Sequence, residues 1–161
     1  MKVIGFDPAA KKNLGIAIVV LKNKKIKKAN AFTQTFPKIE DQERPWLIFQ
    51  YVDNLIFVEK PDLIVFEKTD LFGGSKYIRS LITKCICIIE CCAVKHGVAL
   101  TSLAPASIKK IVTGSGRATK DEVQSSVKKV VSNCEATSEH AWDALASCLA
   151  YLKKEGQWIT T

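Results

Sequence analysis

The first third of the chain consists of apolar runs separated by short polar breaks. Residues 2–7 and 14–21 are two such runs and predict strands, and residues 26–35, which mix apolar and polar positions, predict a third. The lysine-rich break between the second and the third has the length of a hairpin turn. Strands joined in this way form an antiparallel meander. Two later runs, at 62–67 and 98–103, predict a fourth and a fifth strand.

Apolar residues at helical spacing predict five helices, at residues 42–59, 75–96, 105–112, 120–132 and 139–154. The apolar positions of the first are Leu47, Ile48, Tyr51, Leu55 and Val58. The element order βββαβαβααα predicts an α/β fold, with a five-stranded mixed sheet (a three-strand antiparallel meander plus two parallel strands) flanked by helices. No linker or repeat interrupts the pattern, so residues 1–161 are expected to form one domain, with a frayed tail after Gly156.

The predicted helix at 75–96 is apolar on two stripes, which suggests that it is covered on two sides. One stripe contains Leu81, Cys85, Ile88 and Cys92, and the other contains Ile78, Ile82, Ile86 and Ile89. The sheet can cover one stripe. The other predicts contact with a second helix or with a partner subunit.

Charge narrows the class of partner. The 161 residues include 24 basic and 16 acidic ones, which gives a net charge of +8 and a pI near 9.2. A basic domain favours polyanions, nucleic acid first and an anionic membrane second, although lysines also serve solubility. No uncharged run is long enough to cross a membrane. On the edge strand of a sheet, the lysines between 22 and 28 would also oppose aggregation.

The six cysteines do not form a disulfide framework. Four of them, Cys85, Cys87, Cys91 and Cys92, share one predicted helix, where neighbouring thiols point to different sides. The chain has no paired Cys-x-x-Cys motifs for zinc. We therefore expect reduced, buried thiols and a cytoplasmic protein.

Two apolar strands end on carboxylates. Asp7 ends the first strand and Glu67 ends the fourth. If these strands are parallel neighbours, both side chains emerge at the same edge of the sheet, where open α/β sheets place their sites. Two carboxylates that lie close together repel each other unless a cation lies between them. The pattern therefore predicts a divalent-metal site.

The last predicted helix adds two candidate ligands. His140 and Asp143 are three residues apart and lie on one face, and Asp143 stands among apolar residues. A carboxylate near a helix start also has a purely structural explanation in the helix dipole. If this helix docks on the sheet, three carboxylates and one imidazole converge, a set that suits Mg²⁺ or Mn²⁺.

A glycine-rich segment precedes the fourth helix. Gly114 and Gly116 can form a phosphate-binding nest, to which Arg117 and Lys120 add positive charge. The segment is not a P-loop, because Thr119 stands where a glycine should precede the lysine. A flexible turn is the alternative explanation.

These segments together resemble the RuvC-type Holliday-junction resolvases of the ribonuclease H-like superfamily, over about residues 2–152. Gly5-Phe-Asp-Pro8 is similar to the family's first-strand motif, and Phe66-Glu67 falls at its strand-four glutamate. The stretch from Val112 to Gln124 resembles the family's Val-x-Gly-x-Gly-x-Ala-x-Lys-x-x-Val-Gln, which is the most specific of the four motifs. The stretch from His140 to Ala146 resembles its final acidic helix.

The resemblance implies a homodimer, paired through the helix at 75–96, that cuts four-way junction DNA symmetrically. It implies two Mg²⁺ ions, which Mn²⁺ can replace, held by Asp7, Glu67, His140 and Asp143, with Lys120 as the catalytic cation. It also implies DNA contacts from Phe72, Lys76, Arg117 and Lys120, with Phe72 stacking on a base at the crossover. The motifs specify neither a cleavage-site sequence nor a cooperating branch-migration motor.

The sequence departs from the family pattern at three places. Ala9 replaces a glycine, the loop up to Gly15 is one residue longer, and His140 stands where many relatives have aspartate, although other relatives also have histidine there. Glu139 beside His140 can compete as the fourth ligand. Two other functions remain open: an RNA-processing ribonuclease H-like nuclease, and a non-catalytic module that binds branched DNA. The chain is too short for the two lobes of a sugar-kinase-like ATPase.

Overall fold

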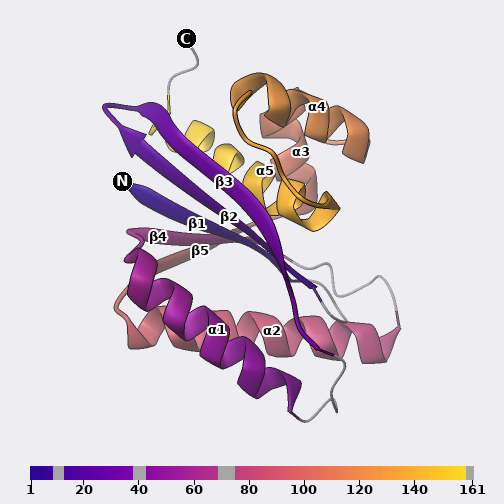
Figure 1. Cartoon of the computed structure of the whole chain (residues 1–161). Coiled ribbons are helices and arrows are strands. Elements are labelled where there is room, and N and C mark those ends of the chain that lie inside the picture. Colours follow the sequence, from indigo (N-terminus) through magenta and orange to yellow (C-terminus); the bar gives the residue numbers. More distant parts are fainter. Residues whose placement is uncertain (9–12, 38–42, 69–74, 159–161) are drawn as a thin grey trace.

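A mixed sheet in the order β3-β2-β1-β4-β5 separates two layers of helices (Figure 1). The computed structural model describes residues 1–8, 13–37, 43–68 and 75–158. Its strands are β1 (Lys2–Pro8), β2 (Asn13–Lys22), β3 (Lys25–Thr35), β4 (Leu63–Glu67) and β5 (Ala99–Leu103). Its helices are α1 (Arg44–Glu59), α2 (Lys76–Lys95), α3 (Pro105–Thr113), α4 (Lys120–Val130) and α5 (Glu139–Lys154). The predicted element order and the mixed α/β architecture are confirmed.

The pairing of the strands explains where the strand-end carboxylates lie. β1 pairs antiparallel with β2 and parallel with β4, and Phe6 lies opposite Phe66. Because β1 and β4 run in the same direction and in this register, Asp7 and Glu67 follow at one edge of the sheet. β4 is also parallel to β5, where Glu67 pairs with Leu103.

Each face of the sheet has its own core. Helices α3, α4 and α5 lie on one face, and α1 and α2 lie on the other (Figure 1). Helix α5 is the most buried of the helices: ten of its sixteen residues are buried, including Leu145, Cys148, Leu149 and Leu152. It crosses the sheet and contacts β1, β2, β3 and β4. Its position therefore decides where the residues at its N-terminus lie.

The buried face of α1 agrees with the predicted one except at Val58. Ile48, Val52 and Ile56 are buried in α1, whereas Val58 is 62% exposed. The spacing 48, 52, 56 follows one ridge of the helix. Of the predicted set, Ile48 is buried, and Leu47, Tyr51 and Leu55 are partly buried and pack against the same core, so the prediction is wrong only at Val58.

Helix α2 is covered from two sides within one chain. Leu81, Cys85 and Ile89 are buried, while Ile82 and Ile86 are half-buried. Helix α1 packs beside α2, so a second helix, one of the two expected alternatives, covers part of its circumference (Figure 1). The face of α2 that points away from the core carries Cys87 and Cys91.

All six cysteines are free thiols, as expected, but the expectation that all are buried is wrong. Cys85, Cys92, Cys134 and Cys148 are buried, whereas Cys87 and Cys91 are exposed. Residues 87 and 91 are one helical turn apart, so both thiols lie on the outward face of α2.

Local sequence signals mark the start of α4 and the end of α2. A capping box forms between Thr119 and Glu122 at the start of α4, and Gly97 follows α2 in the left-handed conformation that favours glycine. The expectation of a frayed tail after Gly156 is wrong for the residues up to Trp158. The Trp158 amide donates to the carbonyl of Leu152, and its side chain packs on the core.

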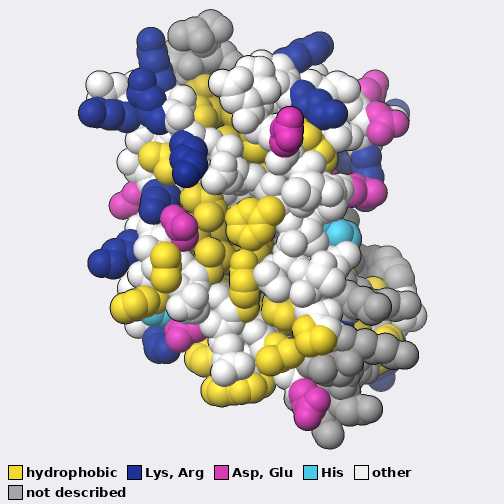
Figure 2. Space-filling model, in the orientation of Figure 1, with side chains coloured by type: hydrophobic (Ala, Val, Ile, Leu, Met, Phe, Trp, Pro, Cys, Tyr) yellow, Lys and Arg dark blue, Asp and Glu magenta, His cyan; other side chains and the backbone are white. Residues whose placement is uncertain are grey.

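Exposed lysines gather at the turn between β2 and β3, at one end of the molecule (Figure 2). They include Lys22, Lys24, Lys25, Lys27 and Lys28. β3 is an edge strand, which agrees with the aggregation-resistance explanation. No helix among the described residues is long and apolar enough to cross a membrane.

Candidate active site

The four predicted ligands line one cleft of about 310 Å³. Its other lining residues include Lys120, Val123, Ile108 and Lys109. Asp7 comes from β1, Glu67 from the end of β4, and His140 and Asp143 from the first turns of α5. The cleft therefore lies where the carboxyl ends of the parallel strands meet the N-terminus of α5.

Two glycines allow α5 to approach the sheet closely. A Cβ on Gly5 of β1 would lie 2.4 Å from the carbonyl oxygen of Ala144, and a Cβ on Gly15 of β2 would lie 2.1 Å from that of His140. Both distances are shorter than any real Cβ contact, so only glycine permits this docking. Gly15 is also the residue that pairs with Asp7. The close approach therefore brings the start of α5 next to the end of β1.

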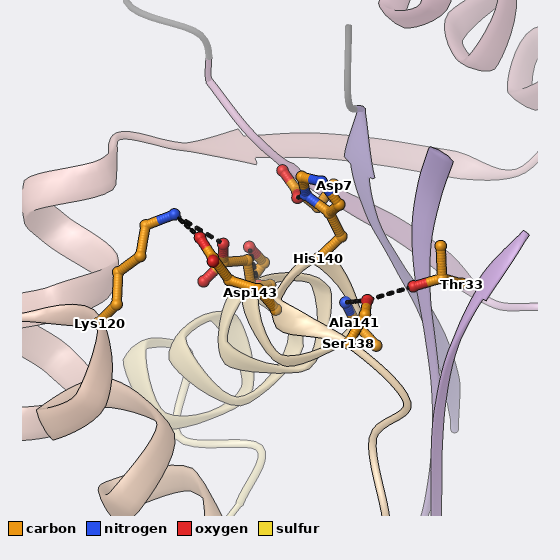
Figure 3. A network of polar contacts seen from close by, with 9 residues as sticks. Asp7, Thr33, Lys120, Ser138, His140, Ala141 and Asp143 are labelled. Atoms are coloured by element: carbon orange, nitrogen blue, oxygen red, sulfur yellow. Dashed lines mark hydrogen bonds and ion pairs between the residues drawn. The ribbon is translucent and has the colours of Figure 1, made fainter. Parts of the chain in front are cut away.

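A side-chain cap fixes the N-terminus of α5. The Ser138 hydroxyl accepts from the amide of Ala141 at 3.3 Å and also bonds the hydroxyl of Thr33 in β3 (Figure 3). The bond from the Ala141 amide satisfies one of the free amides at the start of the helix, and the bond with Thr33 ties the cap to the sheet. His140, two residues further on, is thereby held toward β1.

His140 and Asp7 form the central contact of the cleft. The His140 Nδ1 and the Asp7 Oδ2 are 2.7 Å apart (Figure 3). The bond to Asp7 raises the pKa of His140, against the opposing effect of burial, and the negative charges of Asp7 and Asp143 raise it further. Asp7 is the more buried of the pair, with 17% of its side chain exposed against 36% for His140.

The other two carboxyl groups of the cleft, Glu67 and Asp143, have raised pKa values. Burial raises the pKa of Glu67 to about 7, and the negative charges of Asp7 and Asp143 contribute to this rise. Burial and the charge of Asp7 likewise raise the pKa of Asp143. A site whose carboxylates resist ionisation in this way favours a bound cation, which would remove the repulsion.

Lys120 reaches the cleft from the first turn of α4. Its ammonium bonds the carboxylate of Glu139 and lies 3.9 Å from the Asp143 Oδ2 (Figure 3). Glu139, the alternative fourth ligand, does not line the cleft and is paired with Lys120 instead. Lys109 of α3 also lines the cleft. Lys109 was not predicted, because it belongs to no motif and the sequence does not distinguish it from Lys110 beside it.

The donor set fits a hard divalent cation, although the side chains do not yet surround one. Among the described residues no three His, Cys, Asp or Glu side chains are already spaced to hold a metal ion. His140 is engaged with Asp7, and the carboxylates repel one another. Oxygen-rich donors with one imidazole nonetheless match the preference of Mg²⁺ and Mn²⁺.

Of the predicted DNA contacts that the structure describes, only Lys120 lines this cleft. Arg117 is exposed in the turn before α4, and Lys76 is exposed at the start of α2. Gly114 ends α3 in the left-handed conformation, so it acts as a helix cap. Phe72 lies outside the described residues.

Comparisons with known proteins identify the family of this chain. The family model for the crossover junction endodeoxyribonuclease RuvC matches residues 3–151. A protein of that name from Carboxydothermus hydrogenoformans is 30% identical over 159 residues, which cover 97% of this chain and 98% of the relative. One from Prochlorococcus marinus is 30% identical over 158 residues, covering 97% and 99%.

Solved structures share the fold. Thermus thermophilus RuvC in complex with a Holliday junction substrate matches with a TM-score of 0.82 at 23% identity, covering 96% of this chain and 94% of that one. The yeast mitochondrial Holliday junction resolvase Ydc2 matches with a TM-score of 0.64 at 14% identity, covering 96% and 79%. The expected ribonuclease H-like fold is confirmed. By both the family model and its sequence relatives, the chain belongs to the RuvC family of crossover junction endodeoxyribonucleases.

Proposed function

We propose that this protein resolves Holliday junctions as a metal-dependent endonuclease that makes paired, symmetric nicks in four-way DNA. The observation that carries the proposal is the convergence of Asp7, Glu67, His140 and Asp143 on one cleft, in a chain of the RuvC family. The basic net charge of +8 supports a polyanionic substrate. A module that only bound DNA would not need three carboxylates in one cleft, where they repel one another and the DNA phosphates.

In this proposal the four side chains hold two Mg²⁺ ions, which Mn²⁺ can replace. When bound, the cations supply Lewis acidity at the scissile phosphate. The chain's own residues orient the phosphate: the ammonium groups of Lys120 and Lys109 border the cleft and offset negative charge that develops during cleavage. His140 keeps Asp7 in a fixed orientation through their hydrogen bond.

The DNA is proposed to extend over Lys76 and Arg117, with Phe72 stacking on a base at the crossover. The active species is proposed to be a two-fold homodimer paired through α2, in the reducing cytoplasm. The outward face of α2, with Cys87, Cys91 and the exposed Val94, is the contact surface in this proposal. A Cys91→Arg variant should then sediment as a monomer, and an unchanged dimer would rule out this interface.

Cleavage of a synthetic four-way junction with Mg²⁺ tests the function. Wild-type protein should produce symmetric nicks in two opposed strands, and it should leave a linear duplex of the same sequence and an RNA–DNA hybrid intact. Asp7→Asn should abolish cutting and leave junction affinity unchanged or raised, because repulsion of the phosphate falls. Equal loss of binding and cutting would contradict a ligand role, and cutting of the hybrid alone would favour the RNA-processing alternative.

A further inference from the structure

A pocket apart from the cleft lies between the second halves of α3, α4 and α5 and is here called the lysine-rimmed pocket. Its volume is about 260 Å³. The three helices contact one another on one face of the sheet, and the segment after α5 completes the lining (Figure 1). None of the described residues that line this pocket also lines the cleft.

The inner lining of the lysine-rimmed pocket is apolar. Leu149 of α5 is buried, and Val112 of α3 and Trp158 pack against the same core. The chain reverses at Gly156, and the Trp158 amide donates to the Leu152 carbonyl at 3.2 Å, so Trp158 lies beside the end of α5. An apolar cavity of about 150 Å³ already holds a benzene ring. The pocket therefore has room for one aromatic side chain.

An exposed apolar side chain adjoins this lining. Val130, the last residue of α4, lines the pocket and is 36% exposed. It is the only large hydrophobic side chain that is exposed among the residues of α3, α4 and α5. A ligand in the pocket would also cover Val130, which adds apolar area to the contact.

Both charged residues among the described lining are lysines. Lys129 and Lys153 are exposed, so they stand at the mouth of the pocket. The Lys153 ammonium donates to the Ile111 carbonyl at 2.9 Å, whereas Lys129 makes no hydrogen bond or ion pair with another described residue. Lysines at helix ends also offset the helix dipole, but that role requires no apolar pocket between them. Two ammonium groups beside an apolar pocket suit a carboxylate attached to an apolar group.

We propose that the lysine-rimmed pocket binds the C-terminal tail of a partner protein, an acidic segment that ends in an aromatic residue. The terminal ring enters between Leu149 and Trp158, and the terminal carboxylate binds Lys129 and Lys153. A tail is favoured over a small free acid, because its further acidic side chains are attracted by a protein with a net charge of +8. A DNA phosphate gains nothing from the apolar lining. The contact involves neither DNA nor metal, so it is a function beyond junction cleavage.

The lysine-rimmed pocket and the cleft are far enough apart to be occupied together. Leu149 is nine residues after His140 in α5, which is about 14 Å along the helix. A docked tail therefore leaves the phosphate site open. It also raises the effective concentration of the partner wherever this protein is bound to DNA.

A synthetic peptide tests the proposal in the absence of DNA and Mg²⁺. The probe is fluorescein-Gly-Asp-Asp-Asp-Leu-Phe with a free terminal carboxylate, and fluorescence anisotropy measures its binding to the full chain. Conversion of that carboxylate to an amide should weaken binding about tenfold, the share of one charge-assisted hydrogen bond. Replacing the terminal phenylalanine by alanine should weaken it about thirtyfold, because a buried aromatic anchor supplies most of the affinity.

Matched variants of α4 separate the pocket from general charge attraction. Lys129→Gln should weaken binding of the free acid about tenfold and leave binding of the amide nearly unchanged. Lys128→Gln is the control, because it removes the same charge from the same turn. The Lys128 ammonium lies 5.2 Å from the centroid of the Trp142 ring and does not line the pocket. Ser126→Phe places a ring in the pocket and should abolish binding, with the melting temperature retained.

Several results would overturn the proposal. They are no binding of the free-acid peptide, equal affinity for the acid and the amide, or equal weakening by Lys128→Gln and Lys129→Gln. Displacement of the peptide by single-stranded DNA, with no effect of Ser126→Phe, would assign this surface to nucleic acid instead. Junction cutting without peptide should be the same in wild type and Lys129→Gln. Failure of the pocket and failure of the resolvase function therefore appear in separate assays.

Discussion

On one face of the sheet α5 lies so close to β1 and β2 that glycine stands at both contacts, whereas on the other face α1 and α2 pack through aliphatic side chains. The first face carries His140 and Asp143, and its geometry is fixed by backbone contact. The second contributes no lining residue to the cleft. Backbone contact leaves no room for adjustment, whereas side chains can repack. The position of the two α5 residues in the cleft is therefore set by the close approach of α5 to Gly5 of β1 and Gly15 of β2.

The largest effect is expected from Gly15→Ala. The new methyl group would overlap the His140 carbonyl, so α5 must move away from β2. We expect a loss of about 3 kcal/mol in the free energy of unfolding and a loss of cutting greater than the loss of stability explains. Urea denaturation and junction cleavage measure the two effects.

Gly156→Ala is the matched control for this substitution. A methyl group there meets nothing within 4 Å, and only the left-handed backbone conformation of Gly156 is strained. The expected cost is about 1 kcal/mol, with cutting retained. If both variants behaved alike, the close approach of α5 would not be what positions the site.

A pH-dependent effect of similar size is expected from Glu67→Gln. The pKa of Glu67 is about 7 in the folded protein, above its ordinary value of 4.5, so the folded state keeps a proton that the unfolded state releases. The unfolding free energy therefore falls as pH rises from about 4.5 through 7, by about 3 kcal/mol.

The variant removes this pH dependence, because glutamine does not ionise. Glu67→Gln should therefore be more stable than wild type at pH 8, although it cannot cut. Adding Mg²⁺ should stabilise wild type more than the variant. A variant that is less stable than wild type at pH 8 would contradict the repulsion inferred for the cleft.

Thiol labelling compares the two faces at the level of single residues. Burial raises the pKa values of Cys85 to about 12 and Cys92 to about 11, and it raises that of Cys148 as well. At a dilution at which the proposed dimer has dissociated, only Cys87 and Cys91 should react quickly with iodoacetamide in the folded protein, because both are exposed in the single chain. Mass spectrometry counts the labelled sites. Rapid labelling of Cys148 would show that α5 detaches easily from the sheet.

The smallest effect is expected on the outer surface of α1. Val58→Lys replaces a largely exposed side chain, so the free energy of unfolding should change by less than about 0.5 kcal/mol. Ile56→Ala, two residues away but buried, should cost about 3 kcal/mol. Thermal unfolding of the pair tests whether 48, 52 and 56 form the packed ridge.

Strand ends and element order were predictable from the sequence because they depend on local periodicity. A run of apolar residues that ends in Asp7 or Glu67 places the carboxylate at a strand end whatever surrounds it. The convergence of Asp7 with His140 needed only the docking of one amphipathic helix, which the order of elements implied.

Other features depend on distances that a sequence does not contain. Gly5 and Gly15 look like ordinary strand residues until a helix backbone lies against them. The rotation of α1 about its own axis decided that Val58 is exposed, because the apolar residues of α1 permit more than one buried stripe. Cys87 and Cys91 were expected to be buried because cysteine usually is, yet the outward face of α2 contains both.

The most direct test of the carboxylate cluster is the titration of Glu67 by carboxyl ¹³C NMR, in wild type and in Asp7→Asn, without DNA. The account predicts a pKa near 7 in wild type. It predicts a lower value, still above 4.5 because burial remains, in Asp7→Asn, and a further fall when Mg²⁺ is added. An ordinary wild-type value that neither the substitution nor the cation changes would contradict the claim that these side chains share one site.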